Sequence, residues 1–312
     1  MGERGIRTRL GGYQGPGSIL TQGLQRFAEL LPARFEVSVE ADVPAAGATA
    51  RSLFDSVQAG SREVCYVSSG YLSAQVPELV VLDLPFSVHD RGLALHTLDG
   101  PAGRQLAQAV RRGTGLQLLG YWDNGFRHLS NGRRAIRTPA DCQGLTVRTL
   151  DSAEYRATMQ ALGLNAVTTD VRELRRAVAS GEVDAQENPL TNFVNFELWR
   201  HHGHVSLTGH LFAVALFVCH ADWFDALGAE AQHELMAAAA AATALERTLA
   251  VQEDITAREF LRSSTDVQVL EPDRIDLAAM QRCCAPLVSQ WSARLPPELL
   301  AAYLQPPGSG TA

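Results

Sequence analysis

The chain has 312 residues, 46% of them hydrophobic and 20% charged, and a net charge of −7 from 34 acidic and 27 basic residues. This length is enough for two medium domains with cores of their own, and the composition is that of an ordinary globular protein. The acidic balance argues against nucleic acid as a partner, and no apolar run is long enough to span a bilayer.

The first third of the chain alternates between two periodicities. Strands are predicted where apolar and polar residues alternate or where a short apolar run occurs, and helices where apolar residues recur three or four positions apart. In chain order the predicted elements are a strand 6–10, a Gly/Pro loop 11–17, a helix 19–31 with Ser18 as its N-cap, a strand 35–40, a helix 50–57, and strands 64–67 and 80–84. This alternation predicts an α/β fold with a largely parallel sheet.

Two helices and a strand follow this first third, and a second round of the pattern begins near Gly125. The predicted elements are helices 93–98 and 102–111, a strand 116–122, a strand 145–149, helices 152–162 and 171–179, a strand 183–186, a helix from Pro189 to about 199, strands 205–208 and 212–219, a strand 267–270, and helices 273–291 and 297–304. Residues 230–263 contain no Pro or Gly and a run of alanines, which favours one unusually long helix.

The five cysteines are Cys65, Cys142, Cys219, Cys283 and Cys284. Their number is odd and none has metal-site spacing, so no disulfide framework is expected. The first residues, 1–5, contain no apolar targeting segment. The protein is therefore either cytoplasmic or the mature form of a chain whose signal peptide was removed. The last residues, 305–312, are expected to form a flexible tail.

Catalytic motifs are scarce: the sequence has no GxSxG, P-loop, HExxH or GxGxxG motif. His201, His202 and His204 are close in sequence, but they are expected to be surface residues whose side chains diverge. Asp184 and Glu187 are a possible acid–base pair, although Asp184 is more simply explained as the anchor of a turn. No metal and no cofactor is expected.

Two arginines are candidates for an anion site. Arg148 is placed at the carboxyl end of a predicted strand, and Arg127 just past another. In open α/β sheets ligands bind beyond the carboxyl ends of the strands, and a guanidinium matches a carboxylate. From the residues alone, a surface or structural ion-pair role is the more frequent one for either arginine.

Several blocks in order resemble one family, the solute receptors of TRAP (tripartite ATP-independent periplasmic) transporters of the dicarboxylate-receptor type. The blocks are VLDLPF at 81–86, WDNGFRHLSN at 122–131, RTPADCQGLTVR at 137–148, VDAQENP at 183–189 and LTGH at 207–210. The resemblance extends over about residues 6–304. Departures occur at residues 44–47, where PAAG replaces the family's QLG turn, and at Ala185, which replaces a glycine.

The resemblance implies two α/β lobes joined by crossing strands, with a long helix spanning both. The lobes are expected to comprise residues 1–126 plus 213–253 and residues 127–212 plus 254–304. It also implies hinge closure on a small organic acid and delivery of that acid to two integral membrane subunits. The protein would then be a monomeric periplasmic binding protein and not an enzyme.

The resemblance also implies a set of ligand-binding residues. Arg148 corresponds to the arginine that pairs with the ligand carboxylate, and Arg127 and Asn188 to two further contacts. The positions that vary with the substrate are Tyr13, Ser68, Asp151 and Val171. Two further candidates near the site are Asn124 and His210. Ser68 stands where sialic-acid receptors often have an acidic residue, and Val171 replaces the family's usual Phe, and both departures argue against sialic acid as the ligand.

Two alternatives remain open at this point. One is an α/β enzyme acting on an organic acid, with Asp184, Glu187 or His210 as acid or base. The other is a ligand sensor that uses the same lobes to signal to a receptor.

Overall fold

A computed structural model describes residues 5–304, which fold around one mixed sheet. The strand order is β2-β1-β3-β8-β4-β7-β5-β6, and β9 pairs with β8. The strands are β1 (Ile6–Gly11), β2 (Phe35–Glu40), β3 (Val64–Ser68), β4 (Leu116–Asn131), β5 (Thr146–Thr149), β6 (Asn165–Thr168), β7 (Ala185–Asn188), β8 (His204–His220) and β9 (Gln268–Leu270). The predicted α/β class is confirmed.

Two long strands, β4 and β8, hold the two halves of the sheet together. They run antiparallel along their length, with register shifts at three points. On one side the parallel strands β1, β2 and β3 form a first lobe, attached through β3 to β8. On the other side the parallel strands β5, β6 and β7 form a second lobe, attached through β7 to β4. The lobes therefore share crossing strands, as the family resemblance implies.

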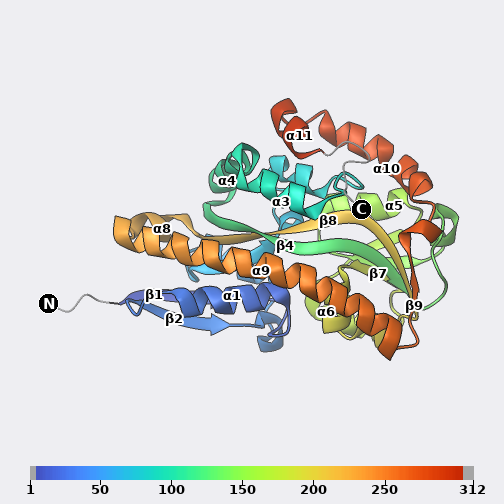
Figure 1. The fold of residues 1–312 in the computed structure, drawn as a ribbon, viewed down its shortest axis with the longest axis horizontal. Helices are drawn as coiled ribbons and strands as arrows, with labels where there is room; N and C mark the ends of the chain where they lie inside the picture. The colour runs from blue at the N-terminus through green and yellow to red at the C-terminus, as the bar shows by residue number, and fades with distance from the viewer. Residues whose placement is uncertain (1–4, 305–312) are drawn as a thin grey trace.

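Helices cover the sheet, as Figure 1 shows. They are α1 (Ile19–Leu30), α2 (Ala50–Gln58), α3 (Arg91–Asp99), α4 (Pro101–Thr114), α5 (Ala153–Ala161), α6 (Val171–Ala179), α7 (Leu190–Asn195), α8 (Ala221–Ala226), α9 (Ala229–Ser264), α10 (Leu277–Ser292) and α11 (Pro297–Tyr303). The Ser18 side chain accepts a hydrogen bond from the Thr21 backbone N–H at 3.1 Å, which confirms it as the N-cap of α1.

The long helix α9 lies across both lobes (Figure 1). Its 36 residues span ~54 Å at the usual rise per residue. It contacts α1 and β4, and it also contacts α7 and β9. The prediction of a single long helix is confirmed. None of the helices in residues 5–304 combines the length and apolar character needed to cross a membrane.

The hydrophobic core is divided between the lobes. One large cluster fills the first lobe, where Trp122 stacks on Phe217 with ring centroids 4.3 Å apart, and extends to Leu150 and Tyr155 of the second lobe. Two smaller clusters fill the second lobe, one around Val147 and Met159 and the other around Phe193 and Leu261. Each lobe thus buries apolar side chains of its own.

Several predicted elements are wrong in detail. The predicted strand 80–84 lies in a 3₁₀ helix, Pro77–Asp83, and strands 205–208 and 212–219 are one continuous strand, β8. The strand predicted at 116–122 continues to Asn131, and β6 was not predicted. All five cysteines are free, as expected. The predicted flexible tail lies outside the described residues.

Candidate functional site

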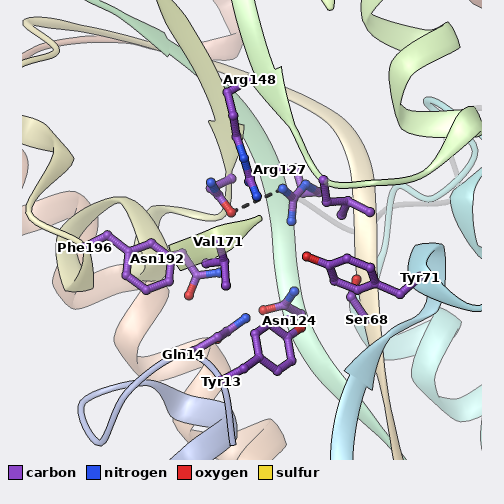
Figure 2. Close-up of a pocket in the computed structure, with 12 residues that line it drawn as sticks. Tyr13, Gln14, Ser68, Tyr71, Asn124, Arg127, Arg148, Val171, Asn192 and Phe196 are labelled. Atoms are coloured by element: carbon purple, nitrogen blue, oxygen red, sulfur yellow. Dashed lines mark hydrogen bonds between the residues drawn. The ribbon is translucent and has the colours of Figure 1, made fainter. Parts of the chain in front are cut away.

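A pocket lies between the lobes, at the carboxyl ends of β1, β3, β5 and β7 and beside the middle of β4 (Figure 2). This is the edge at which open α/β sheets bind ligands. Seven of the nine residues predicted to bind a ligand line it. They are Tyr13, Ser68, Asn124, Arg127, Arg148, Val171 and Asn188.

Arg148 enters the pocket from β5 in the second lobe (Figure 2). Its exposed fraction is 2%. The Nη2 and Nε atoms donate to the Thr169 carbonyl oxygen, at 2.5 and 3.1 Å, and no carboxylate in residues 5–304 forms an ion pair with it. Burial lowers the pKa of Arg148 below its ordinary value. The side chain is therefore a buried cation without a counterion, which is costly unless an anion joins it.

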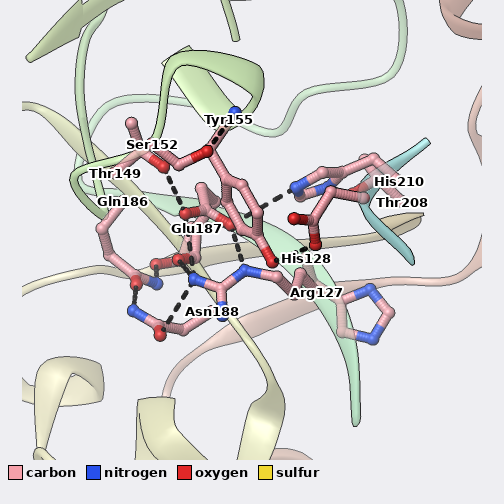
Figure 3. Close-up of polar contacts among 12 residues, drawn as sticks. Arg127, His128, Thr149, Ser152, Tyr155, Gln186, Glu187, Asn188, Thr208 and His210 are labelled. Atoms are coloured by element: carbon pink, nitrogen blue, oxygen red, sulfur yellow. Dashed lines mark hydrogen bonds and ion pairs between the residues drawn. The ribbon is translucent and has the colours of Figure 1, made fainter. Parts of the chain in front are cut away.

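Arg127 enters the same pocket from β4, with different surroundings (Figure 3). Its Nε pairs with Glu187 Oε2, and its Nη2 donates to Glu187 Oε1 at 2.9 Å and to Asn188 Oδ1 at 3.2 Å. The Tyr155 ring lies 5.2 Å from the guanidinium carbon, a cation–π distance. The position of Arg127 just past a strand was predicted incorrectly, since it lies within β4.

Glu187 balances the charge of Arg127. Burial by itself raises the pKa of Glu187, but the charge of Arg127 and the hydrogen bonds from His210 and Arg127 together outweigh burial and lower the pKa to about 2. Thr149 Oγ1 also donates to Glu187 Oε1, at 2.6 Å. Glu187 is thus an ionised structural partner, and the pair Arg127–Glu187 adds no net charge to the pocket.

The first-lobe side of the pocket presents neutral polar groups. Tyr13 follows β1, Ser68 ends β3 and Asn124 lies in β4. The Tyr66 hydroxyl accepts the Tyr13 backbone N–H at 3.0 Å and so fixes the loop after β1. Buried side-chain oxygens without a hydrogen bond of ordinary geometry belong to four lining residues, Tyr13, Gln14, Ser68 and Asn124. Such groups are satisfied by a polar ligand or by water.

Five lining residues were not predicted from the sequence. They are Gln14, Tyr71, Leu150, Asn192 and Phe196. Asn192 and Phe196 follow Asn188 at intervals of four residues, so helical spacing from the Pro189 turn is a signal that could have found them. Tyr71 lies in a short 3₁₀ turn, Ser69–Tyr71, that no sequence pattern indicates.

The pocket is nearly closed. The free space between its side chains is about 20 Å³, room for about one water molecule. A wider hollow of about 390 Å³ adjoins it and shares Tyr13, Gln14, Val171 and Phe196 with it. Access from solvent to the arginines therefore runs past these four side chains.

Two predicted residues do not line the pocket. Asp151 is exposed, one residue beyond the pocket residue Leu150. His210 is buried on β8 beside Glu187, with Nε2 3.5 Å from Glu187 Oε2 and Nδ1 2.8 Å from Thr208 Oγ1 (Figure 3). Burial lowers the pKa of His210. From this position His210 can help to hold Glu187 in place, and it does not reach the pocket lining.

The other candidates have structural roles. Asp184 accepts the Thr146 backbone N–H at 3.0 Å and pairs with Arg133, as a turn anchor does. His202 is buried, 3.0 Å from Ser130 Oγ, so the expectation of a surface position is wrong for it. In residues 5–304 no three potential metal ligands come together.

The chain matches known proteins along its length. Residues 10–294 match the model of a family described as bacterial extracellular solute-binding protein, family 7. A solute-binding protein of Verminephrobacter eiseniae is 33% identical over 77% of this chain and 71% of its own length. The 2,3-diketo-L-gulonate-binding periplasmic protein YiaO of Escherichia coli is 31% identical over 65% of this chain and 62% of its own length.

Solved structures share the fold. The sugar acid binding protein DctPAm of Advenella mimigardefordensis, in complex with galactonate, is 26% identical with a TM-score of 0.89, over 96% of this chain and 97% of that one. A TRAP periplasmic solute binding protein of Polaromonas, bound to D-erythronate, is also 26% identical with a TM-score of 0.89, over 96% of this chain and 98% of that one.

Proposed function

The chain belongs to family 7 of the bacterial extracellular solute-binding proteins, the DctP-type receptors of TRAP transporters, and on this premise we propose that it captures a small organic acid between its lobes. The ligand carboxylate would pair with Arg148 and would also accept a hydrogen bond from Arg127. The family is one of binding proteins, and its members are extracytoplasmic. A periplasmic location follows for this chain as part of the proposal.

The observation on which the proposal chiefly depends is the unpaired charge of Arg148. A guanidinium that is 2% exposed has lost most of its hydration and has only neutral hydrogen-bond partners, the carbonyl and hydroxyl oxygens of Thr169. A carboxylate entering the pocket would supply the missing charge and a bidentate acceptor. The acids named for the structural relatives, galactonate and D-erythronate, have such a carboxylate.

The small free space supports a step of lobe opening and closure. About 20 Å³ does not admit an organic acid, so the lobes or the side chains between them must move apart before one enters. The crossing strands β4 and β8 connect the lobes and are where such a hinge would bend. The closed, loaded receptor would then deliver the acid to integral membrane subunits for uptake.

The proposal includes the absence of turnover. Glu187 is committed to Arg127, and Asp184 to the Thr146 backbone and to Arg133. Neither is free to act as an acid or base on a bound acid. Recovery of the bound acid unchanged after long incubation with the protein is expected, and the appearance of a product would favour the enzyme alternative. A sensor role differs only in the membrane partner.

A thermal-shift screen of organic acids and neutral sugars tests the proposal. A ligand at about 100-fold its dissociation constant adds roughly 2.7 kcal/mol to the free energy of unfolding. At least one carboxylate is expected to raise the melting temperature, while neutral sugars and polyols leave it unchanged. Stabilisation by a neutral sugar and by no carboxylate would overturn the proposal.

A further inference from the structure

The pocket contains one unbalanced charge. Among the side chains that line it only Arg127 and Arg148 are ionised, and Arg127 is already matched by Glu187. The arginines of the adjoining hollow, Arg172 and Arg175, are exposed and do not line the pocket, and they pair with Glu173 and Glu197, which also pair with Arg176 and Arg200. A ligand with one negative charge would therefore balance the pocket, and a second negative charge would find no free cation among the side chains that line it.

Arg127 is not available to balance a second carboxylate. Its Nε and Nη2 atoms are engaged by Glu187 and Asn188, and the depressed pKa of Glu187 keeps that carboxylate ionised. Its Nη1 group can still donate a hydrogen bond to a ligand. This contact adds a donor to the site without adding net charge.

The polar groups opposite Arg148 suit hydroxyls. The side-chain carbonyl oxygens of Gln14 and Asn124 are buried acceptors without a donor. A hydroxyl can donate to them, but a second carboxylate has no proton to give and would add acceptors beside acceptors. The Tyr13 hydroxyl lies near the Ser68 backbone, and the Ser68 hydroxyl lies near Tyr155, in neither case with a hydrogen bond of ordinary geometry. Both hydroxyls can therefore pair with further ligand hydroxyls. A ligand ammonium would find two arginines and no free carboxylate.

We propose, building on the proposed function, that the pocket selects a monocarboxylate bearing several hydroxyl groups and rejects dicarboxylates of the same length. The carboxylate would lie against Arg148 in the second lobe. The hydroxyl groups would face Gln14, Ser68 and Asn124 in the first lobe. Closure of the lobes would then bring the carboxylate contact and the hydroxyl contacts together on one ligand.

Matched ligand series test this selectivity by calorimetry on the whole chain. The four-carbon series is erythronate, tartrate, succinate, butanoate and erythritol, and the six-carbon series is galactonate, galactarate, adipate, hexanoate and galactitol. In at least one series the hydroxylated monocarboxylate is expected to bind about 10-fold or more tightly than the dicarboxylates and the deoxy acid, because these leave a charge or polar groups unpaired. The polyols should not bind.

The outcomes separate this inference from the proposed function. Binding of tartrate, succinate, galactarate or adipate as tightly as the matching monocarboxylate would overturn only the selectivity. Failure of every acid in both series, while another carboxylate stabilises the protein in the thermal-shift screen, would also overturn only the selectivity. Failure of every carboxylate in both experiments would overturn the proposed function with it.

A single hydroxyl provides a second, independent test. Tyr13→Phe keeps the ring against Phe54 and Tyr66 and removes the unpaired hydroxyl. The affinity for the hydroxylated acid is expected to fall about 2- to 10-fold, while that for the deoxy acid is unchanged. Tyr303→Phe is the matched control, because its hydroxyl is also buried and unpaired but its ring does not line the pocket. Equal effects of Tyr13→Phe on both acids would contradict the proposed contact.

Discussion

Arg127 and Arg148 both line the same pocket, but only Arg127 has a carboxylate beside it (Figure 2). Arg127 is balanced by a buried carboxylate, whereas Arg148 has a backbone carbonyl as its partner. Arg127, held by Glu187, forms part of the pocket wall. Arg148 should attract an anion strongly, because its charge is already desolvated before the ligand arrives.

Removing the Glu187 charge should destabilise the fold. Glu187→Gln leaves Arg127 buried without a counterion, and the expected loss is about 3–5 kcal/mol in the free energy of unfolding, measured by urea denaturation at pH 7. Glu182→Gln, at an exposed partner of Arg176, is the control and should cost less than about 1 kcal/mol. Equal losses in the two variants would show that Arg127 does not depend on Glu187.

The same pair predicts a pH dependence. Folding lowers the pKa of Glu187 from its ordinary 4.5 to about 2, so the folded state binds fewer protons in this window. The stability contributed by Glu187 is therefore complete above pH 4.5 and is lost as the pH falls toward 2. Glu187→Gln should lack this part of the acid dependence, so its stability and that of the natural chain should converge in acid. A constant difference between them from pH 7 to 3 would contradict the assignment.

The residues of the site were partly predictable. The ordered sequence blocks indicated Arg127, Arg148 and Asn188, and all three line the pocket. The pairing of Arg127 with Glu187 was not predictable, because it depends on the antiparallel register that places His128 opposite Asn188. The ligand contacts of Asp151 and His210 stay predictions, and both residues lie outside the pocket lining.

At the scale of elements, β-bulges in β4 set the direction of the side chains that this strand contributes to the pocket. Register shifts against β8 occur between Asp123 and Gly125 and between Arg127 and Leu129, on both sides of Arg127. A bulge re-directs a side chain and bends the strand. Gly125 has φ +90°, and a Cβ placed there would lie 3.2 Å from Pro189 Cβ, next to the start of α7.

Gly125→Ala should therefore disturb both the strand and the pocket. The left-handed backbone and the tight contact with Pro189 are expected to lower the free energy of unfolding by about 1–2 kcal/mol and to weaken acid binding. Urea denaturation and calorimetry measure the two effects. Gly203→Ala, where the backbone is not left-handed and the space is open, is the control. A Gly125→Ala protein as stable as the control would contradict this role for the bulge.

Elements with a long, clear pattern were predictable, and short apolar runs were not. The helix α9 follows from a stretch without Pro or Gly. Residues 80–84 form an apolar run that suits a buried strand as well as a buried helical turn, and Pro77 at the first helical position decides for the 3₁₀ helix. The edge strand β6 alternates exposed and half-buried residues, too weak a signal to identify it.

At the scale of the whole molecule, contacts cross between the lobes near the pocket. Asp170 Oδ2 in the second lobe accepts the Ala50 backbone N–H at 3.1 Å, and Asn195 Nδ2 donates to the Gln14 carbonyl oxygen at 3.0 Å. Both hydrogen bonds link a residue of the first lobe to a residue of the second. They must break for the lobes to separate, and a ligand bound by both lobes would favour their re-formation.

Ligand binding should therefore make the molecule more compact. In small-angle X-ray scattering the radius of gyration is expected to fall when the acid identified by the thermal-shift screen is added, because the ligand shifts the population toward closed lobes. A neutral polyol should leave it unchanged. A radius of gyration that is the same with and without a saturating acid would contradict closure as part of the function.

The central claim is that Arg148 binds the carboxylate of the ligand, and titration calorimetry of Arg148→Ala tests it most directly. Arg133→Ala, which removes an exposed arginine that pairs with Asp184, is the control for the loss of an arginine as such. Arg148→Ala should stay folded, with a melting temperature no lower than that of the natural chain, because no ion pair is lost. Binding of the acid is expected to weaken by about 2–5 kcal/mol in Arg148→Ala and to be unchanged in Arg133→Ala. An Arg148→Ala protein that binds the acid with the affinity of the natural chain would contradict the claim.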